Sequence, residues 1–268
     1  MRRSLLASVL LLVHATADEP RRSPGCGTSP LPGGTSAQTL ASGGRDRHFQ
    51  VHVPAAYDPD DLTPVVLRFH GWGGSGSVNS LRGTADAETF IVVAPTGVGG
   101  GQNPDGGANS WNGGGSTTSP GPSGPSCFPG SPEYCYDSCA VRPQGCHPCD
   151  WTTCNDDFAF VDELLDWVEQ NLCVDPARIF ATGHSNGGQF VWALGARLAS
   201  GRLAAIAPSA GQPHTGFGEG VALGARPVSI MDVHGIRDVR PQAIPTATSP
   251  HEAGYIRRTS DRFNIINH

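Results

Sequence analysis

The spacing of apolar positions along the chain predicts strands and helices that follow one another in turn. Short, nearly continuous apolar runs predict strands of a mostly parallel sheet at 65–69, 90–94, 178–182, 203–208 and 228–233. Apolar residues at three- and four-residue spacing predict helices at 157–172 and from Gly188 onward. Residues 48–53 alternate apolar with polar, which predicts a half-buried edge strand. Because strands alternate with helices, we expect one α/β domain over residues 18–268.

The first 17 residues have the pattern of a secretory signal. Arg2 and Arg3 precede an apolar core at 4–13, and Ala15-Thr16-Ala17 forms an A-x-A cleavage site. The apolar core is too short to span a bilayer, although an uncleaved anchor is the alternative. We therefore expect an exported, soluble protein. The Gly/Pro/Ser-rich segment that follows, to about Gly44, is expected to be irregular.

The cysteines also fit an exported protein. Six of the eight cysteines lie between residues 127 and 154. In an exported chain these favour disulfides, although Cys135-x3-Cys139 and Cys146-x2-Cys149 loosely fit a zinc site with His147. The sequence does not choose the pairing. We expect 97–155 to be a long disulfide-rich insertion, which lies either at the active-site rim or on the surface without a substrate role.

The charge of the chain argues against two classes of partner. The net charge is −6, and 16% of residues are charged. Neither value suggests nucleic acid or an anionic membrane surface as a partner. The oligomeric state is left open.

The segment Gly183-His184-Ser185-Asn186-Gly187 matches G-x-S-x-G, the nucleophile elbow of serine hydrolases. It lies between a predicted strand and a predicted helix, where a sharp turn would expose the Ser185 hydroxyl. The backbone N–H of Asn186 would then lie at a helix N-terminus, where an oxyanion can be held. The alternative is a glycine-rich turn with a solvated serine, in a chain that has 36 glycines.

Two further segments supply partners for this serine. The loop His70-Gly71-Trp72-Gly73-Gly74 follows the strand 65–69, so the backbone N–H of Trp72 is the second candidate oxyanion donor. An ordinary glycine turn is the alternative there. Asp238 follows the strand 228–233 and is the candidate acid, because α/β-hydrolases place the serine, the acid and the histidine in that order. Asp232 competes with it but lies within the predicted strand.

The catalytic histidine is left unassigned. Only His251, in a Pro/Thr/Ser-rich stretch, and His268, the last residue, follow Asp238. The side chain of His184 is expected to point away from the position of a base. His70 and His234 precede glycines, and we interpret them as residues that hold loops in place.

Together these motifs resemble the secreted esterases grouped as feruloyl esterases and polyhydroxybutyrate-type depolymerases. The collinear matches are Gly25-Cys26-Gly27, 47–54 with Tyr57-Asp58, His70-Gly71, Ser110-Trp111-Asn112, Asp156-Asp157-x2-Phe160, 174–179, 183–188 and His234-Gly235-x2-Asp238. The resemblance implies an α/β-hydrolase fold with helices on both faces of the sheet and ester hydrolysis. It also implies Ser185 and Asp238 as two triad members. Residues 262–268 look like the start of the family's next segment, so we expect the catalytic histidine beyond the given end.

The sequence thus favours a secreted serine esterase that cleaves acyl esters on a polysaccharide or ester bonds in a polyester. We expect it to need no metal or cofactor. One alternative is a catalytically inactive, truncated hydrolase-fold product. The other is a polymer-binding protein, in which 127–154 contacts a wall polymer.

Overall fold

The computed structural model describes residues 21–28, 31–100, 108–113, 136–140, 152–197, 202–211 and 228–233. The expected signal segment, most of the cysteine cluster, Asp238 and every histidine after His184 lie outside these residues. Within the described part of the chain, no helix is long and apolar enough to cross a membrane.

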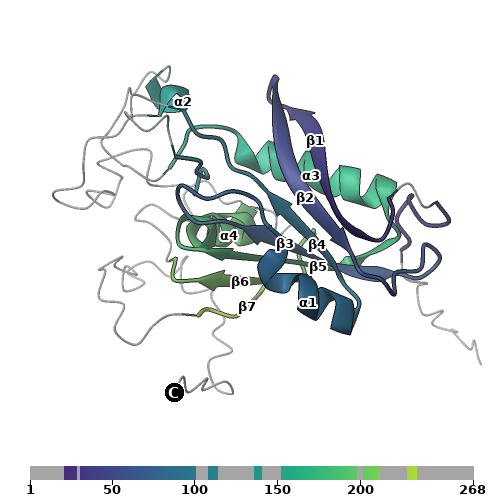
Figure 1. Ribbon diagram of the computed structural model, residues 1–268. Coiled ribbons are helices and arrows are strands. Elements are labelled where there is room, and N and C mark those ends of the chain that lie inside the picture. Colours follow the sequence, from purple (N-terminus) through teal and green to yellow (C-terminus); the bar gives the residue numbers. More distant parts are fainter. Residues whose placement is uncertain are drawn as a thin grey trace, which may run out of the picture.

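The described strands form one seven-stranded sheet in the order β1-β2-β4-β3-β5-β6-β7 (Figure 1). The pairs β1–β2 and β2–β4 are antiparallel, and the remaining pairs are parallel. This mostly parallel arrangement is that of the α/β-hydrolase fold, so the predicted fold class is confirmed. The strand bounds are β1 Gly34–Ser42, β2 Arg45–Val53, β3 Thr63–Phe69, β4 Ile91–Pro95, β5 Val174–His184, β6 Ala205–Ser209 and β7 Ser229–Ile230.

Helices cover both faces of the sheet, as expected. The side chains of β4 alternate between two cores: Ile91 and Val93 pack into the cluster that contains the apolar residues of two helices, α3 and α4. Val92 and Ala94 point the other way and pack with Ala85 of α1. The described helices are α1 Asn79–Glu88, α2 Asp137–Ala140, α3 Asp157–Asn171 and α4 Asn186–Arg197.

The edge of the sheet differs from the sequence-based expectation. Residues 34–42, expected to be irregular, form the nine-residue strand β1, which pairs with β2 over its whole length from Gly34↔Val53 to Ser42↔Arg45. The strand at 48–53 is therefore an inner strand and not an edge strand. In the sequence GTSAQTLAS, Leu40 is the one large apolar residue, so the segment lacks the hydrophobic alternation by which strands are recognised.

The segment 21–28 is tied to the junction of α3 and β5. A disulfide joins Cys26 to Cys173, which confirms the expectation that the chain forms disulfides and gives one pairing that the sequence left open. Ser23 donates from Oγ to the carbonyl of Leu172 at 2.7 Å and accepts from the amide of Val174 at 2.9 Å. A Cβ placed on Gly25 would lie 2.5 Å from the backbone nitrogen of Leu172, so only glycine fits there.

The helix α3 begins where the sequence predicts. Asp156 caps the helix, because its side chain accepts a hydrogen bond from the amide of Ala159 at 3.0 Å. The predicted apolar stripe is buried: Phe158, Val161, Leu164, Leu165 and Val168.

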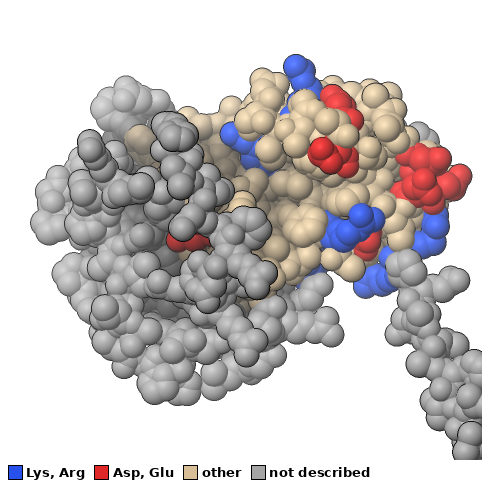
Figure 2. Space-filling model, turned by 90° about the horizontal axis from the view of Figure 1, so that it is seen from below, with Lys and Arg blue, Asp and Glu red and all other residues tan. Residues whose placement is uncertain are grey.

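On the face drawn in Figure 2, basic and acidic side chains of the described residues lie close to one another.

Candidate active site

Ser185 occupies the turn between β5, which ends at His184, and α4, which begins at Asn186. Its φ of 55° lies in the left-handed region, which is unfavourable for a residue with a Cβ. The turn is held on both sides, because the Ser185 amide donates to the carbonyl of Ser209 and the Ser185 carbonyl accepts from the amide of Gln189, each at 2.9 Å. The predicted strand–turn–helix geometry is thus present.

Glycines let three backbone segments meet at this turn. A Cβ on Gly187 would lie 2.4 Å from the carbonyl oxygen of His70, and one on Gly183 would lie 2.4 Å from that of Gly187. A Cβ on Gly211 would lie 2.2 Å from the carbonyl oxygen of Ser185. Real Cβ atoms do not approach so closely, so these contacts require glycine.

The loop 70–74 lies directly against the elbow. A Cβ on Gly71 would be 3.4 Å from the Cβ of Ser185 and 3.3 Å from the carbonyl oxygen of His184. Two amides later in this loop are hydrogen-bonded: that of Gly73 donates to the carbonyl of Asn109, and that of Gly74 donates to the carbonyl of Gly71. Among the hydrogen bonds of the described residues, none involves the amide of Trp72. That N–H is therefore available to an incoming group.

His70 holds this loop in place. Its Nε2 accepts from the amide of Gly97 at 2.8 Å, so the proton of the neutral ring sits on Nδ1, which donates to the carbonyl of Gly71 at 2.7 Å. Burial lowers the pKa of His70 and so favours this neutral form. Both ring nitrogens are occupied, so His70 has the predicted loop-holding role and is not placed to act as a base.

A buried aromatic cluster lies beneath the loop. The ring of Trp111 stacks on Phe190 at 5.3 Å with an interplanar angle of 7°, and meets the edge of Phe69 at 5.1 Å. Its Nε1 donates to the carbonyl of His70 at 3.0 Å. These contacts fix the end of β3 to the first helix after the elbow.

The side chain of Asn186 clamps the segment that carries Trp111. Its Oδ1 accepts from Ser110 Oγ at 3.0 Å and from the amide of Trp111 at 2.9 Å, and its Nδ2 donates to the carbonyl of Trp111 at 3.3 Å. Asn186 is fully buried. Its side chain is thus structural, while its backbone N–H begins α4 next to Ser185.

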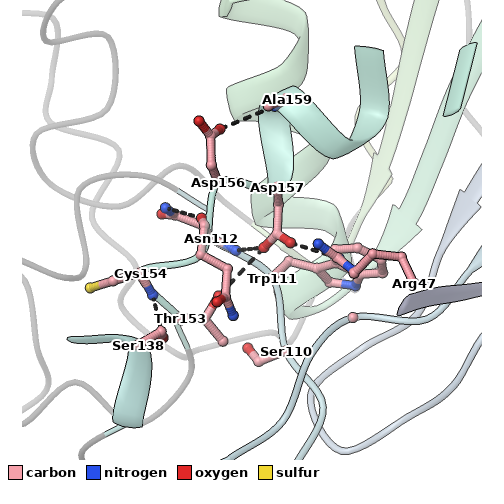
Figure 3. A network of polar contacts seen from close by, with 12 residues as sticks. Arg47, Ser110, Trp111, Asn112, Ser138, Thr153, Cys154, Asp156, Asp157 and Ala159 are labelled. Atoms are coloured by element: carbon pink, nitrogen blue, oxygen red, sulfur yellow. Dashed lines mark hydrogen bonds and ion pairs between the residues drawn. The ribbon is translucent and has the colours of Figure 1, made fainter. Parts of the chain in front are cut away.

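A buried ion pair lies behind this segment (Figure 3). Asp157 Oδ1 accepts from Arg47 Nη2 at 2.7 Å, and Asp157 Oδ2 accepts from the amide of Asn112 at 2.8 Å and from Thr153 Oγ1 at 3.4 Å. The guanidinium carbon of Arg47 also lies 3.8 Å from the ring centre of Phe160. Burial raises the pKa of Asp157 and lowers that of Arg47, against their mutual attraction.

Comparison with known proteins supports the same family resemblance. No family model matches the chain. Feruloyl esterase C of Emericella nidulans is 27% identical over 253 residues, which cover 89% of this chain and 70% of the relative. Probable feruloyl esterase C of Aspergillus niger shows the same identity and coverage. By sequence and fold, the chain is an esterase of the α/β-hydrolase type.

One solved structure that is similar to this esterase is LpqC, the poly(3-hydroxybutyrate) depolymerase of Bordetella parapertussis. It is 22% identical with a TM-score of 0.42, over 66% of this chain and 52% of that chain. The esterase chain therefore spans about half of that solved structure.

Part of the insertion expected at 97–155 reaches the loop 70–74. Trp72 donates from Nε1 to the hydroxyl of Tyr136 at 2.7 Å, and that hydroxyl donates to the carbonyl of Ala108 at 2.8 Å. Nearby, the amide of Cys154, which is itself disulfide-bonded, donates to Ser138 Oγ at 3.0 Å. Among the described residues of the insertion, Tyr136 therefore contacts the loop 70–74 directly, through the side chain of Trp72.

The remaining triad candidates of the esterase fall mostly outside the described residues, among them Asp238, His251 and His268. Asp232 is described: it is exposed and lies beyond the end of β7 at Ile230, rather than within the strand. Two described histidines are engaged elsewhere, His48 with Thr39 Oγ1 at 3.0 Å and His52 with Asp86 at 2.9 Å. Sequence reasoning missed the pairing of Arg47 with Asp157.

Proposed function

We propose that this chain carries the nucleophile and oxyanion donors of a serine esterase. Ser185 is the nucleophile, the backbone N–H groups of Trp72 and Asn186 are the oxyanion donors, and Asp238 orients a histidine base. The observation that carries the proposal is the left-handed Ser185 in a strand–helix turn, with the loop of Gly71 packed against it. A serine fixed in this way presents its hydroxyl outward, next to the backbone donors.

The proposed reaction has two halves. The Oγ of Ser185 forms a bond to the acyl carbon while its proton passes to the histidine, and the alcohol leaves with that proton. Water then gives a proton to the histidine while its oxygen bonds to the acyl carbon. The bond from the acyl carbon to Oγ breaks, the acid leaves, and the histidine returns the proton to the Oγ of Ser185. In each half, negative charge develops on the carbonyl oxygen, where two N–H donors lower the barrier. The hydrogen bonds of His70 keep the donor loop in one conformation.

For the substrate, we infer acyl esters carried by a polysaccharide. The support is the sequence similarity to feruloyl esterase C over 89% of the chain. A polyester is the second candidate, from the resemblance in the sequence motifs. We further propose that the protein is exported, because the N-terminal pattern matches a secretory signal and Cys26–Cys173 is a disulfide.

Labelling with a fluorophosphonate probe, followed by peptide mass spectrometry, tests the nucleophile. The probe forms a stable bond with an activated serine, so we expect labelling at Ser185 together with hydrolysis of p-nitrophenyl acetate. Ser185→Ala should abolish both signals. Ser36→Ala, on the edge strand β1, is the matched control and should leave both unchanged. Undiminished hydrolysis by Ser185→Ala would overturn the mechanism, and a wild-type protein that neither labels nor hydrolyses would support the inactive alternative.

A further inference from the structure

The chain contacts the nucleophile turn again where β6 ends, between β5 and β7 (Figure 1). The carbonyl of Ser209, the last residue of β6, accepts from the amide of Ser185 at 2.9 Å. Two residues later, a Cβ placed on Gly211 would lie 2.2 Å from the carbonyl oxygen of Ser185. The segment 209–211 therefore contacts both backbone polar groups of the proposed nucleophile.

Ala210, between these two contacts, has a strained backbone. Its φ of 46° lies in the left-handed region, which is unfavourable for alanine. An extended residue would carry the chain onward along the strand, whereas a left-handed residue turns it at once, so that Gly211 meets the carbonyl of Ser185. The amide of Ala210 donates to the carbonyl of Val233 at 2.8 Å. The bend thus occurs where the chain is also bound to the segment that follows β7.

A single peptide group links the nucleophile turn to that segment. The carbonyl of Ser209 and the amide of Ala210 belong to one planar, rigid unit. The carbonyl accepts from Ser185, and the amide donates to Val233. In the sequence, Val233 precedes the proposed acid, Asp238, by five residues. A shift of the chain at Val233 is therefore transmitted to the backbone of Ser185.

We propose that Ala210 is a positioning residue, which fixes the segment leading to the acid against the turn of the nucleophile. This rests on the proposed function, in which Asp238 orients the histidine that takes the proton of Ser185. The proton passes only when the base lies within hydrogen-bond reach of the serine oxygen. A displacement of about 1 Å between reacting groups can lower the rate about 100-fold. The bend and the amide of Ala210 both oppose such a displacement.

Two proline substitutions separate this role from a general loss of stability. Ala210→Pro removes the amide that donates to Val233 and forces φ to about −65°. Thr89→Pro is the matched control, because Thr89 has a φ of 52° at the end of α1 and its amide donates to the carbonyl of Ala85. Each variant loses one backbone hydrogen bond and one left-handed residue. With p-nitrophenyl acetate, we expect Ala210→Pro to lower kcat about 100-fold at unchanged KM, and Thr89→Pro to change neither.

Two milder substitutions test the bend while they retain the amide. Glycine adopts a positive φ freely, so Ala210→Gly should keep the kcat of the wild type. A β-branched residue resists a positive φ, so Ala210→Val should lower kcat even if Ala210→Pro does not fold. Equal kcat in the Gly and Val variants overturns the inference, and so does a loss in Thr89→Pro as large as that in Ala210→Pro.

Amide hydrogen exchange of Ser185, measured by NMR, gives a readout that does not need turnover. Ala210→Pro leaves the carbonyl of Ser209 in place but releases the other end of its peptide group. We expect the Ser185 amide to exchange about two- to tenfold faster, the factor for one lost backbone hydrogen bond, and Thr89→Pro to leave this rate unchanged. Unchanged exchange in Ala210→Pro contradicts the link. An inactive wild-type protein whose exchange still responds would retain the link and lose the proposed function, and full activity of Ala210→Pro would do the reverse.

Discussion

Arg47 of β2 and Asp157 of α3 form an ion pair of 2.7 Å in which the two side chains are 3% and 0% exposed. The second oxygen of the same carboxylate accepts from the amide of Asn112. One side chain therefore joins an inner strand, a helix and the segment that carries Trp111. The pair therefore holds the segment 110–112, which contacts Asn186 next to the elbow, against β2 and α3.

Removal of one partner of this pair should be costly. Asp157→Asn would leave the buried Arg47 without its counter-charge, and we expect a loss of about 3–5 kcal/mol in the free energy of unfolding, measured in urea. The apolar double variant Arg47→Met/Asp157→Leu should recover much of that loss. Arg178→Met is the control, since Arg178 is half exposed in its pair with Asp175 and should cost at most about 1 kcal/mol. Equal losses for the buried and the exposed pair would contradict this account.

His70 should make stability depend on pH. Burial lowers its pKa, so the unfolded chain takes up a proton below about pH 6.5 that the folded chain resists. The free energy of unfolding contributed by His70 is therefore constant above about pH 6.5 and falls below it, by at most about 1.4 kcal/mol per pH unit. Urea unfolding at about pH 7.5 and about pH 5.5, on either side of that value, measures this slope. His70→Gln should flatten it, and an unchanged slope in that variant would refute the assignment.

Two glycine-to-alanine changes should act in opposite directions. Gly187→Ala places a Cβ 2.4 Å from the carbonyl oxygen of His70, so the elbow must shift and thermal stability should fall sharply. Gly83 lies inside α1, and a Cβ added there would meet nothing within 4 Å, so Gly83→Ala should raise stability by about 0.5–1 kcal/mol. Differential scanning calorimetry of the two variants measures both changes in thermal stability. A tolerated Gly187→Ala would show that the backbone crossing is looser than described.

The side-chain amide of Asn186 should contribute through its buried hydrogen bonds. Asn186→Ala removes its bonds to Ser110 and Trp111 and leaves the amide of Trp111 without that acceptor, which should cost about 2–3 kcal/mol. Asn171→Ala is the control, because it removes one half-buried bond to the carbonyl of Trp167 at 2.8 Å and should cost about 1 kcal/mol. Chemical denaturation of both variants tests the difference. Similar losses would argue against the clamp.

The sequence predicts elements well where apolar side chains mark the buried face. The elbow is such a case, since the strand before Ser185 and the helix after it both carry clear apolar patterns. The strand β1 and the helix α1 escape prediction for the opposite reason. In β1 the inward-facing positions carry small or polar residues except for Leu40, and in α1 the buried residue is Ala85 alone.

The sequence does indicate that Arg47, one member of the buried pair, lies on the buried face of its strand. Arg47 lies two, four and six residues before Phe49, Val51 and Val53, and side chains at even spacing point to the same face of a strand. A charge on a buried face demands a partner, but the sequence cannot say that the partner lies 110 positions away at Asp157. The contact of Trp72 with Tyr136 is equally hidden. Tertiary contacts of this kind depend on how loops fold over the sheet.

The disulfide has a consequence for the order of events during synthesis. Cys173 follows Cys26 by 147 residues, so the first thiol leaves the ribosome long before its partner exists. By then β1 to β4 and all of α3 have already been translated. The three strands β5, β6 and β7 come after Cys173, so the bond can first form before they have been translated. The six cysteines between residues 127 and 154 are also translated before the native partner of Cys26. If Cys26 first pairs with one of these cysteines, the native bond to Cys173 forms only by thiol–disulfide exchange.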